Sequence, residues 1–186
     1  NQIGINKDNM KELAIGLKEN HTIKGLDLFK NELGTFKENM KFLSEILKEN
    51  KSIKELNLVE NHLGVNTENI KELSIGIKDS KMLQVLDLSN NDLGESVENI
   101  LELSKALREN KYLEGLNLDN NKLGCNVENM RNLANGLKDN KTLKSLNLSE
   151  NGLFKDNNIE NLNELAIGLK DNFTIKSIYI WGNGLD

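Results

Sequence analysis

The residues that most often carry out chemistry in proteins are scarce in this chain of 186 residues. It has one cysteine, Cys125, and two histidines, His21 and His62, which are forty-one positions apart. A cysteine nucleophile needs a base beside it, and a Cys/His zinc site needs several such ligands. Glycine-rich phosphate-binding signatures are also missing from the sequence. We therefore predict that the protein is not an enzyme and uses no metal or cofactor.

Asparagine recurs at a spacing that could be mistaken for a polar functional site. Five asparagines follow one another at intervals of thirty residues, and a sixth comes after thirty-two. They are Asn31, Asn61, Asn91, Asn121, Asn151 and Asn183. Because every one occupies the same place in a repeated segment, we expect a buried structural ladder. Each amide would bond backbone groups of the turn that follows a strand.

These asparagines belong to an internal repeat that runs through the whole chain. Consecutive segments read HTIKGLDLFKNELG, KSIKELNLVENHLG, KMLQVLDLSNNDLG and KYLEGLNLDNNKLG, and two more follow the same template. The alternating leucines of each segment indicate a short strand with one buried face. The rest of each repeat places apolar residues at helical spacing, as at Ile70, Leu73 and Ile77. Each repeat therefore predicts one strand followed by one helix.

Local signals indicate how each helix begins, ends and packs. Asn66 and Asn126 are suitable N-cap residues, while Asn50 and Asn140 stand where a helix should close in a left-handed C-cap. A small side chain follows the middle leucine of every helix, as at Ser44. We expect this small residue to let the helix pack close to the sheet.

The repeated unit L-x-x-L-x-L-x-x-N-x-L-G resembles the leucine-rich repeat, and the resemblance covers the full length of the chain. The repeat length and the helical second half are similar to the ribonuclease-inhibitor-like class. Two departures are the asparagine, where ribonuclease inhibitor often has cysteine, and the slightly longer repeat. The resemblance implies an α/β fold, a right-handed solenoid shaped as a horseshoe arc. Its parallel sheet would line the concave face and its α-helices the convex face.

One repeat cannot bury enough apolar surface to fold by itself, so neighbouring repeats must stack. We expect a single leucine-rich repeat domain over residues 1–186. Its parts are a partial repeat 1–20, repeats 21–50, 51–80, 81–110, 111–140 and 141–172, and a partial repeat 173–186. The repeat 141–172 carries two extra residues around Asp156 to Asn158. Both ends fall inside a repeat, which suggests a fragment of a longer array.

The strand positions that face away from the helices vary between repeats, as expected of a surface that selects a partner. The predicted partner-binding residues are Asp27, Phe29, Glu55, Asn57, Val59, Asp87, Asn117, Asp119, Asn147, Tyr179 and Trp181. With the adjoining turns, this concave surface holds eight acidic residues against two lysines, which favours a basic partner. Phe29 lies at one end of the surface, and Tyr179 and Trp181 lie at the other. Such aromatic residues are common interface anchors, although Trp181 could equally cover the end of the array.

Charge and composition indicate the class of partner and the compartment. The net charge is −5 with acids and bases intermixed, which disfavours nucleic acid as a partner. No segment is apolar for long enough to span a membrane. A single cysteine predicts a cytoplasmic, intracellular protein, and we expect a monomer. Five N-x-S/T tripeptides could suggest secretion instead, but four of them occupy one repeat position and are interpreted as a by-product of the pattern.

These features together predict a protein–protein interaction scaffold or adaptor that binds its partner on an acidic concave face. Two alternatives stay open at the level of sequence. The repeats are similar to those of Ran GTPase-activating proteins, which would make this a GTPase-activating or GTPase-regulating protein. The chain could also be the ligand-sensing repeat region of a larger NOD-like receptor. Neither alternative has support beyond the repeat itself.

Overall fold

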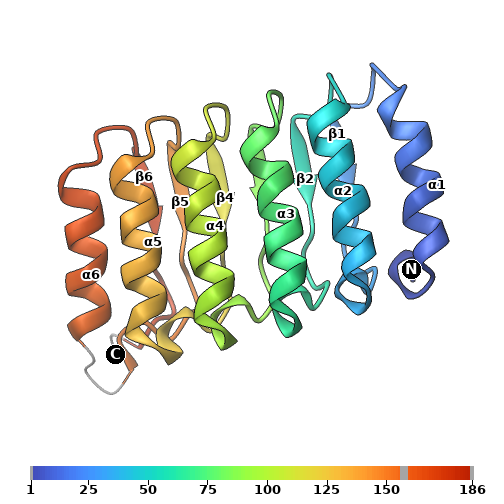
Figure 1. Cartoon of the computed structure of the whole chain (residues 1–186). Coiled ribbons are helices and arrows are strands. Elements are labelled where there is room, and N and C mark those ends of the chain that lie inside the picture. The colour runs from blue at the N-terminus through green and yellow to red at the C-terminus, as the bar shows by residue number, and fades with distance from the viewer. Residues whose placement is uncertain (1, 156–158, 185–186) are drawn as a thin grey trace.

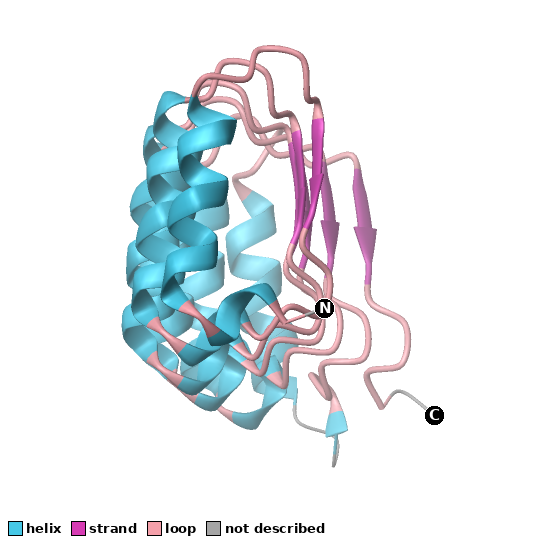
Figure 2. Ribbon diagram, turned by 90° about the vertical axis from the view of Figure 1, so that its right-hand side faces the viewer, coloured by secondary structure: helices cyan, strands magenta, loops and turns pink. Residues whose placement is uncertain are grey.

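The computed structural model describes residues 2–155 and 159–184, which form one layer of helices and one layer of strands (Figures 1 and 2). The α-helices are α1 (Lys7–Lys18), α2 (Lys37–Glu49), α3 (Thr67–Asp79), α4 (Val97–Glu109), α5 (Val127–Asp139) and α6 (Ile159–Lys170). The strands are β1 (Gly25–Asp27), β2 (Glu55–Asn57), β3 (Val85–Asp87), β4 (Gly115–Asn117), β5 (Ser145–Asn147) and β6 (Ser177–Tyr179). The two extra residues expected around Asp156 to Asn158 lie outside the described residues.

The strands form a six-stranded parallel sheet whose order follows the sequence from β1 to β6. Neighbouring strands pair in the register that the repeat predicts, so that Leu26 lies beside Leu56 and Leu56 beside Leu86. All helices cover the same face of the sheet, and its other face is left uncovered (Figure 2). The predicted α/β leucine-rich repeat solenoid is confirmed.

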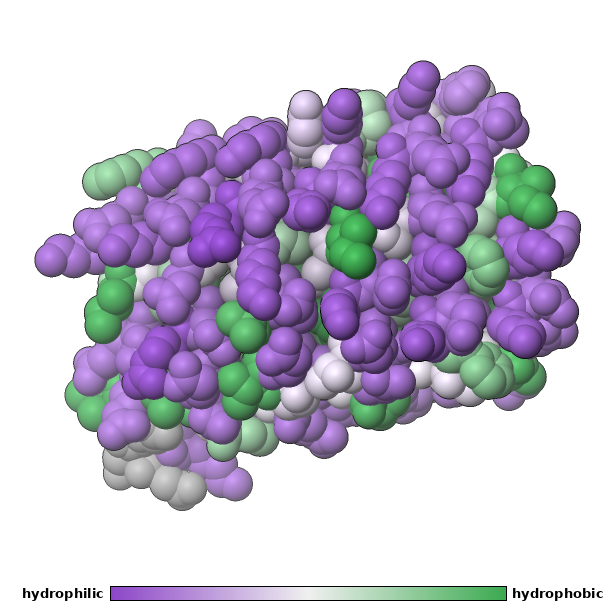
Figure 3. Space-filling view, viewed as in Figure 1, coloured by the Kyte–Doolittle hydropathy of each residue, from purple (hydrophilic) through white to green (hydrophobic). Residues whose placement is uncertain are grey.

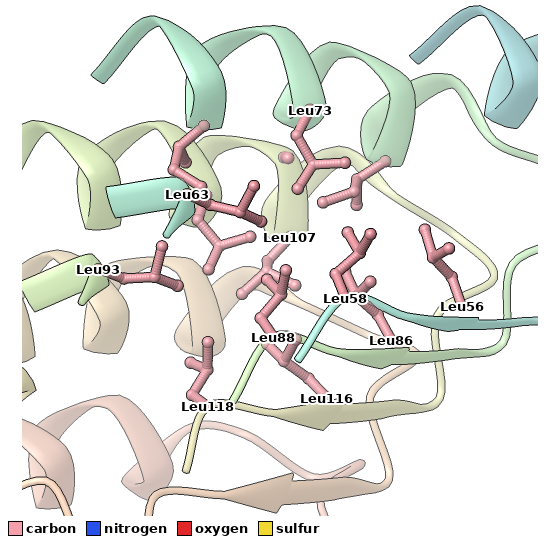
Figure 4. Close-up of a cluster of buried hydrophobic side chains, with 14 of the residues drawn as sticks. Leu56, Leu58, Leu63, Leu73, Leu86, Leu88, Leu93, Leu107, Leu116 and Leu118 are labelled. Carbon is pink, nitrogen blue, oxygen red and sulfur yellow. The ribbon is translucent and has the colours of Figure 1, made fainter. Parts of the chain in front are cut away.

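The core fills the space between the two layers with repeated leucines (Figure 4). Leu56 and Leu58 point from the β2 segment toward Leu73 of α3, and Leu86 and Leu88 take the same places one repeat later. All five of these leucine side chains are at most 2% exposed. Burial of each such side chain stabilises the fold by roughly 1.5–3 kcal/mol. A strand of only three residues is therefore held chiefly by the packing of its leucines and its two neighbouring strands.

The recurring asparagine in the turn after each strand joins adjacent repeats through both its amide oxygen and its amide nitrogen. Asn61 is fully buried, and its Oδ1 accepts the backbone N–H groups of Asn31 at 3.0 Å and Leu33 at 3.2 Å. Its Nδ2 donates to the carbonyl oxygens of Leu28 at 2.8 Å and Leu58 at 3.0 Å. Asn91 repeats the four contacts one coil later. These side chains consequently have no capacity left for a ligand.

The asparagines that close the helices do not adopt the left-handed cap expected from the sequence, so that expectation was wrong. Asn50 is extended, with φ −67° and ψ 137°. Its Nδ2 donates to the carbonyl oxygens of Leu17 at 2.6 Å and Asn20 at 2.8 Å, both in the preceding repeat. Its Oδ1 accepts the backbone N–H groups of Ser52 and Ile53, each at 2.7 Å. Extended backbone is needed because the side chain must reach across to the neighbouring coil.

A third asparagine series lies in the first turn of the helices, and sequence reasoning missed it. Asn69 is fully buried, and its Nδ2 donates to the carbonyl oxygens of Gly34 at 3.0 Å and Leu63 at 3.3 Å. The equivalent side chains make at least one such contact; they are Asn39, Asn99, Asn129 and Asn161. The signal was present in the sequence as a constant Glu-Asn-apolar tripeptide in these repeats.

The small residues after the middle leucine lie against the next helix, a contact that the prediction of close packing on the sheet did not include. A Cβ atom added to Gly76 of α3 would lie 2.6 Å from the Cα of Ser44 in α2. Gly136 of α5 approaches Ser104 of α4 in the same way. Small side chains on one helix and glycines on the next therefore set how closely the helices approach.

The outer side of the helix layer is mostly hydrophilic, with isolated apolar residues (Figure 3). Ile15, Ile75 and Ile167 are among the exposed apolar residues of the helices. Single exposed apolar residues are normal on soluble proteins. Within residues 2–155 and 159–184, no helix is long and apolar enough to cross a membrane.

Candidate partner-binding face

The uncovered face of the sheet, here called the concave face, brings one polar position of each repeat into a row. The last residues of successive strands are direct neighbours in the pairing register. In order they are Asp27, Asn57, Asp87, Asn117, Asn147 and Tyr179. Adjacent strands are about 4.8 Å apart, so the six side chains span roughly 25 Å. Their aligned placement gives the concave face a continuous polar stripe.

The Asp and Asn residues of this stripe also hold the turns that follow the strands. In each case Oδ1 accepts the backbone N–H group two residues later, at 2.9 to 3.0 Å. Aspartate and asparagine can both supply that oxygen, which explains why the two alternate at this position. Asp87 is tied further, because its Oδ2 accepts from Nδ2 of Asn117 at 2.9 Å. Sequence reasoning assigned these residues to binding alone and missed the turn role.

A hollow of about 380 Å³ opens on the concave face over β1 to β3. Asp27, Glu55 and Asp87 line it with carboxylates, and Val85, which is 46% exposed, adds apolar surface to the lining. Gly25 lies at its edge with no side chain to narrow it. The hollow can therefore receive a long side chain that carries a positive charge at its end.

A second group of carboxylates follows strands β3 to β5. Partial burial of the Asp119 carboxylate raises its pKa above the ordinary 3.8, and the negative charges of Glu150 and Asp87 raise it further. One carboxylate oxygen of Asp119 is buried and has no hydrogen-bond partner among the described residues. The ionised form of Asp119 is thus poorly stabilised by its own surroundings, and a nearby cation would stabilise it.

The remaining predicted binding residues do not gather at one point. Phe29 is 43% exposed beyond β1, whereas Tyr179 and Trp181 are 50% and 60% exposed at the β6 end. Val59 is half-buried after β2. The aromatic side chains therefore lie at opposite ends of the polar stripe, as their repeat positions predict, and they form no common pocket.

The residues considered first for catalysis also remain apart. Cys125 is exposed at the end of a 3-10 helix, Leu123–Cys125, and His62 precedes the 3-10 helix two repeats earlier. Among the described residues, no group of three or more His, Cys, Asp or Glu side chains could hold a metal ion.

Comparisons with known proteins agree with this architecture. Two family models, both described as a leucine-rich repeat, match residues 82–103 and 139–162. No curated protein matches the sequence. Among solved structures, leiomodin-1 actin-binding site 2 is 20% identical with a TM-score of 0.61, covering 87% of this chain and 90% of that one. The tropomodulin C-terminal domain from Caenorhabditis elegans is 18% identical with a TM-score of 0.65, covering 88% and 93%.

At these identities the similarity to solved structures establishes a shared fold. The family models identify the repeat in two separate coils, and the remaining coils continue it in the same register. The chain is a leucine-rich repeat protein.

Proposed function

We propose that this protein is a non-enzymatic interaction scaffold that binds a protein with a basic surface on its concave face. The observation that carries the proposal is the row of aligned polar side chains from Asp27 to Asn147, with acidic groups on both sides of it. At roughly 25 Å long, the stripe is large enough for a standard interface of about 800 Å² per partner.

The balance of charge supports a basic partner. Both lysines of the predicted surface are already paired, Lys30 with Glu60 at 3.0 Å and Lys122 with Asp92 at 2.8 Å. Five further carboxylates have no ion-pair partner among the described residues. They are Asp27, Glu55, Asp87, Asp119 and Glu150. A basic partner would therefore meet an excess of negative charge, which accelerates association and excludes acidic competitors.

One named partner class can be tested first. Leiomodin-1 actin-binding site 2 has the same fold, so an actin surface is a sensible first choice for a direct binding assay. We expect the ribonuclease-inhibitor-like subclass, the intracellular location and the monomeric state to accompany this role.

The test must neutralise charge without loosening the turns, because Oδ1 of Asp27 accepts the backbone N–H of Phe29. The triple variant Asp27→Asn, Glu55→Gln and Glu150→Gln removes three charges and keeps an acceptor oxygen at each position. The matched control Glu12→Gln, Glu19→Gln and Glu109→Gln removes three charges from exposed positions on the helix side.

Each variant is used to capture partners from extracts of the source cell, and the affinity for each captured protein and for actin is then measured directly. We expect the concave triple variant to bind its partner about three- to a hundredfold more weakly, since each of the three lost exposed ion pairs contributes roughly 0.2–1 kcal/mol. The helix-side control should bind as the unmodified protein does. Equal affinity of both triple variants would refute binding at the concave face.

A further inference from the structure

A second surface, opposite in charge to the concave face, lies along the loops that connect helix C-termini to strands, at the upper edge of Figure 1. Lys111, Lys141, Lys144 and Lys176 gather there around a hollow of about 390 Å³. Tyr112 and Phe173 line the same hollow. We call this set of six residues the lysine rim.

The loops of the lysine rim are held in place by the helix-closing asparagines. Oδ1 of Asn110 accepts the backbone N–H groups of Tyr112 at 2.8 Å and Leu113 at 2.7 Å. Asn140 and Asn172 hold the next two loops through the equivalent bonds. The rim is therefore ordered before any ligand arrives, which lowers the entropic cost of binding.

The positive charges of the rim are mostly uncompensated. Glu114 is the acidic residue that lines the hollow, and it pairs with Lys144 at 2.6 Å. Lys111, Lys141 and Lys176 are exposed and have no carboxylate within ion-pair distance among the described residues. Three positive charges in a chain whose net charge is −5 form a local field that attracts an anion.

The rim also exposes apolar surface in an unusual place. Phe173 is 89% exposed and Tyr112 is 45% exposed. Phe173 stands at the repeat position where the four preceding repeats have lysine, at 51, 81, 111 and 141. An aromatic side chain with so little packing of its own contributes little to the fold, and aromatic residues beside basic ones are typical of interface anchors.

From this placement we infer that the lysine rim is a docking site for an extended acidic segment of another protein. The carboxylates of the segment pair with Lys111, Lys141 and Lys176, and an aromatic or large aliphatic side chain enters the hollow between Tyr112 and Phe173. The complementarity is both electrostatic and apolar, which favours a peptide over a purely anionic ligand. This site is independent of the concave face and does not depend on the function proposed for that face.

The test uses fluorescence anisotropy of the whole chain with a labelled, glutamate-rich peptide that has a Phe-Leu pair at its centre. The triple variant Lys111→Glu, Lys141→Glu and Lys176→Glu should weaken binding by at least about tenfold, because three attractions become repulsions. Phe173→Ala should weaken it about fivefold, whereas a triple change of the same lysines to arginine should retain it.

Two controls separate the rim from general electrostatics. Lys7→Glu, Lys11→Glu and Lys41→Glu change the net charge equally at exposed positions on α1 and α2, and should leave peptide binding intact. The concave triple variant should also bind the peptide normally. Melting curves of all variants are compared, and no change is expected because the substituted side chains are exposed.

Three kinds of outcome would overturn the inference. One is the absence of saturable peptide binding, or equal loss of binding in the α1–α2 control. Another is equal affinity for a peptide whose Phe-Leu pair is replaced by Ala-Ala, which would leave the hollow without a role. The third is tighter binding of phosphatidylserine vesicles or of a single-stranded oligonucleotide than of the peptide, lost in the same rim variant.

Discussion

At the scale of single residues, the asparagine ladder shows how a polar side chain can be wholly structural. Asn91 accepts two backbone N–H groups and donates to three carbonyl oxygens, and it is fully buried. We expect Asn91→Ala to lower the free energy of unfolding by about 3–5 kcal/mol, because several buried backbone groups lose their partners. Urea denaturation measures this loss. Asn126→Ala, which removes an exposed helix cap, should lower the free energy of unfolding by only about 1 kcal/mol. An equal loss of stability in both variants would contradict the structural role of the asparagine ladder.

The carboxylate of Asp119 adds negative charge to the concave face, but its partial burial lowers the stability of the fold. The equivalent positions Ser89 and Ser149 each donate their hydroxyl to the stripe residue two positions earlier. Asp119→Ser supplies that donor and removes a buried, unpaired carboxylate oxygen, so we expect stability at neutral pH to rise by up to about 1 kcal/mol.

The pH dependence of the same variant checks the cause. The pKa of Asp119 is raised in the fold, so the folded state holds its proton more strongly than the unfolded state does. The wild-type protein should therefore lose stability, relative to Asp119→Ser, as pH rises from about the ordinary 3.8 through the raised pKa. Thermal melts of both proteins across acidic pH measure this difference. The same pH dependence of the melting temperature in both proteins would show that the fold does not raise the pKa of Asp119.

At the scale of elements, the contacts between helices offer a matched pair of substitutions. A Cβ atom on Gly76 would collide with the backbone of Ser44, whereas one on Gly16, at the same repeat position in α1, meets nothing within 4 Å. We expect Gly76→Ala to destabilise by about 1–3 kcal/mol and Gly16→Ala to stabilise by about 0.5–1 kcal/mol. Chemical denaturation measures the free energy of unfolding of the two variants. If that free energy changed in the same direction in both, close helix contact at Gly76 would be excluded as the cause.

The sequence could predict the elements because each repeat applies the same rules. Leucine alternation located the strands, and the spacing of Ile70, Leu73 and Ile77 located the buried helix face. The direction in which Ser44 points could not be predicted, since it depends on how neighbouring helices stack. The double role of Asp27 was also hidden, because its placement on an exposed strand position suggests binding and its turn contact is local. The lysine rim was missed because its residues come from three different loops.

At the scale of the whole molecule, stability should vary along the stack. A repeat in the middle is covered on both sides, and α3 has six buried residues where α1 has three. We expect amide hydrogen exchange to be slowest in α3 and α4 and faster in α1. Exchange measured by mass spectrometry tests this gradient, and uniform protection from α1 to α6 would indicate a single all-or-none unit.

The hydrogen bonds of the helix-closing asparagines have a consequence for the cellular compartment in which such a chain can fold. Asn50 and Asn140 each begin an N-x-S/T tripeptide, the acceptor signal for N-linked sugars. Their Nδ2 atoms, the point of sugar attachment, already donate to backbone carbonyls of the preceding coil at 2.6 Å. A glycan added at either nitrogen before folding would displace those carbonyls and separate two coils. Passage through a compartment that glycosylates nascent chains would therefore oppose the formation of this solenoid.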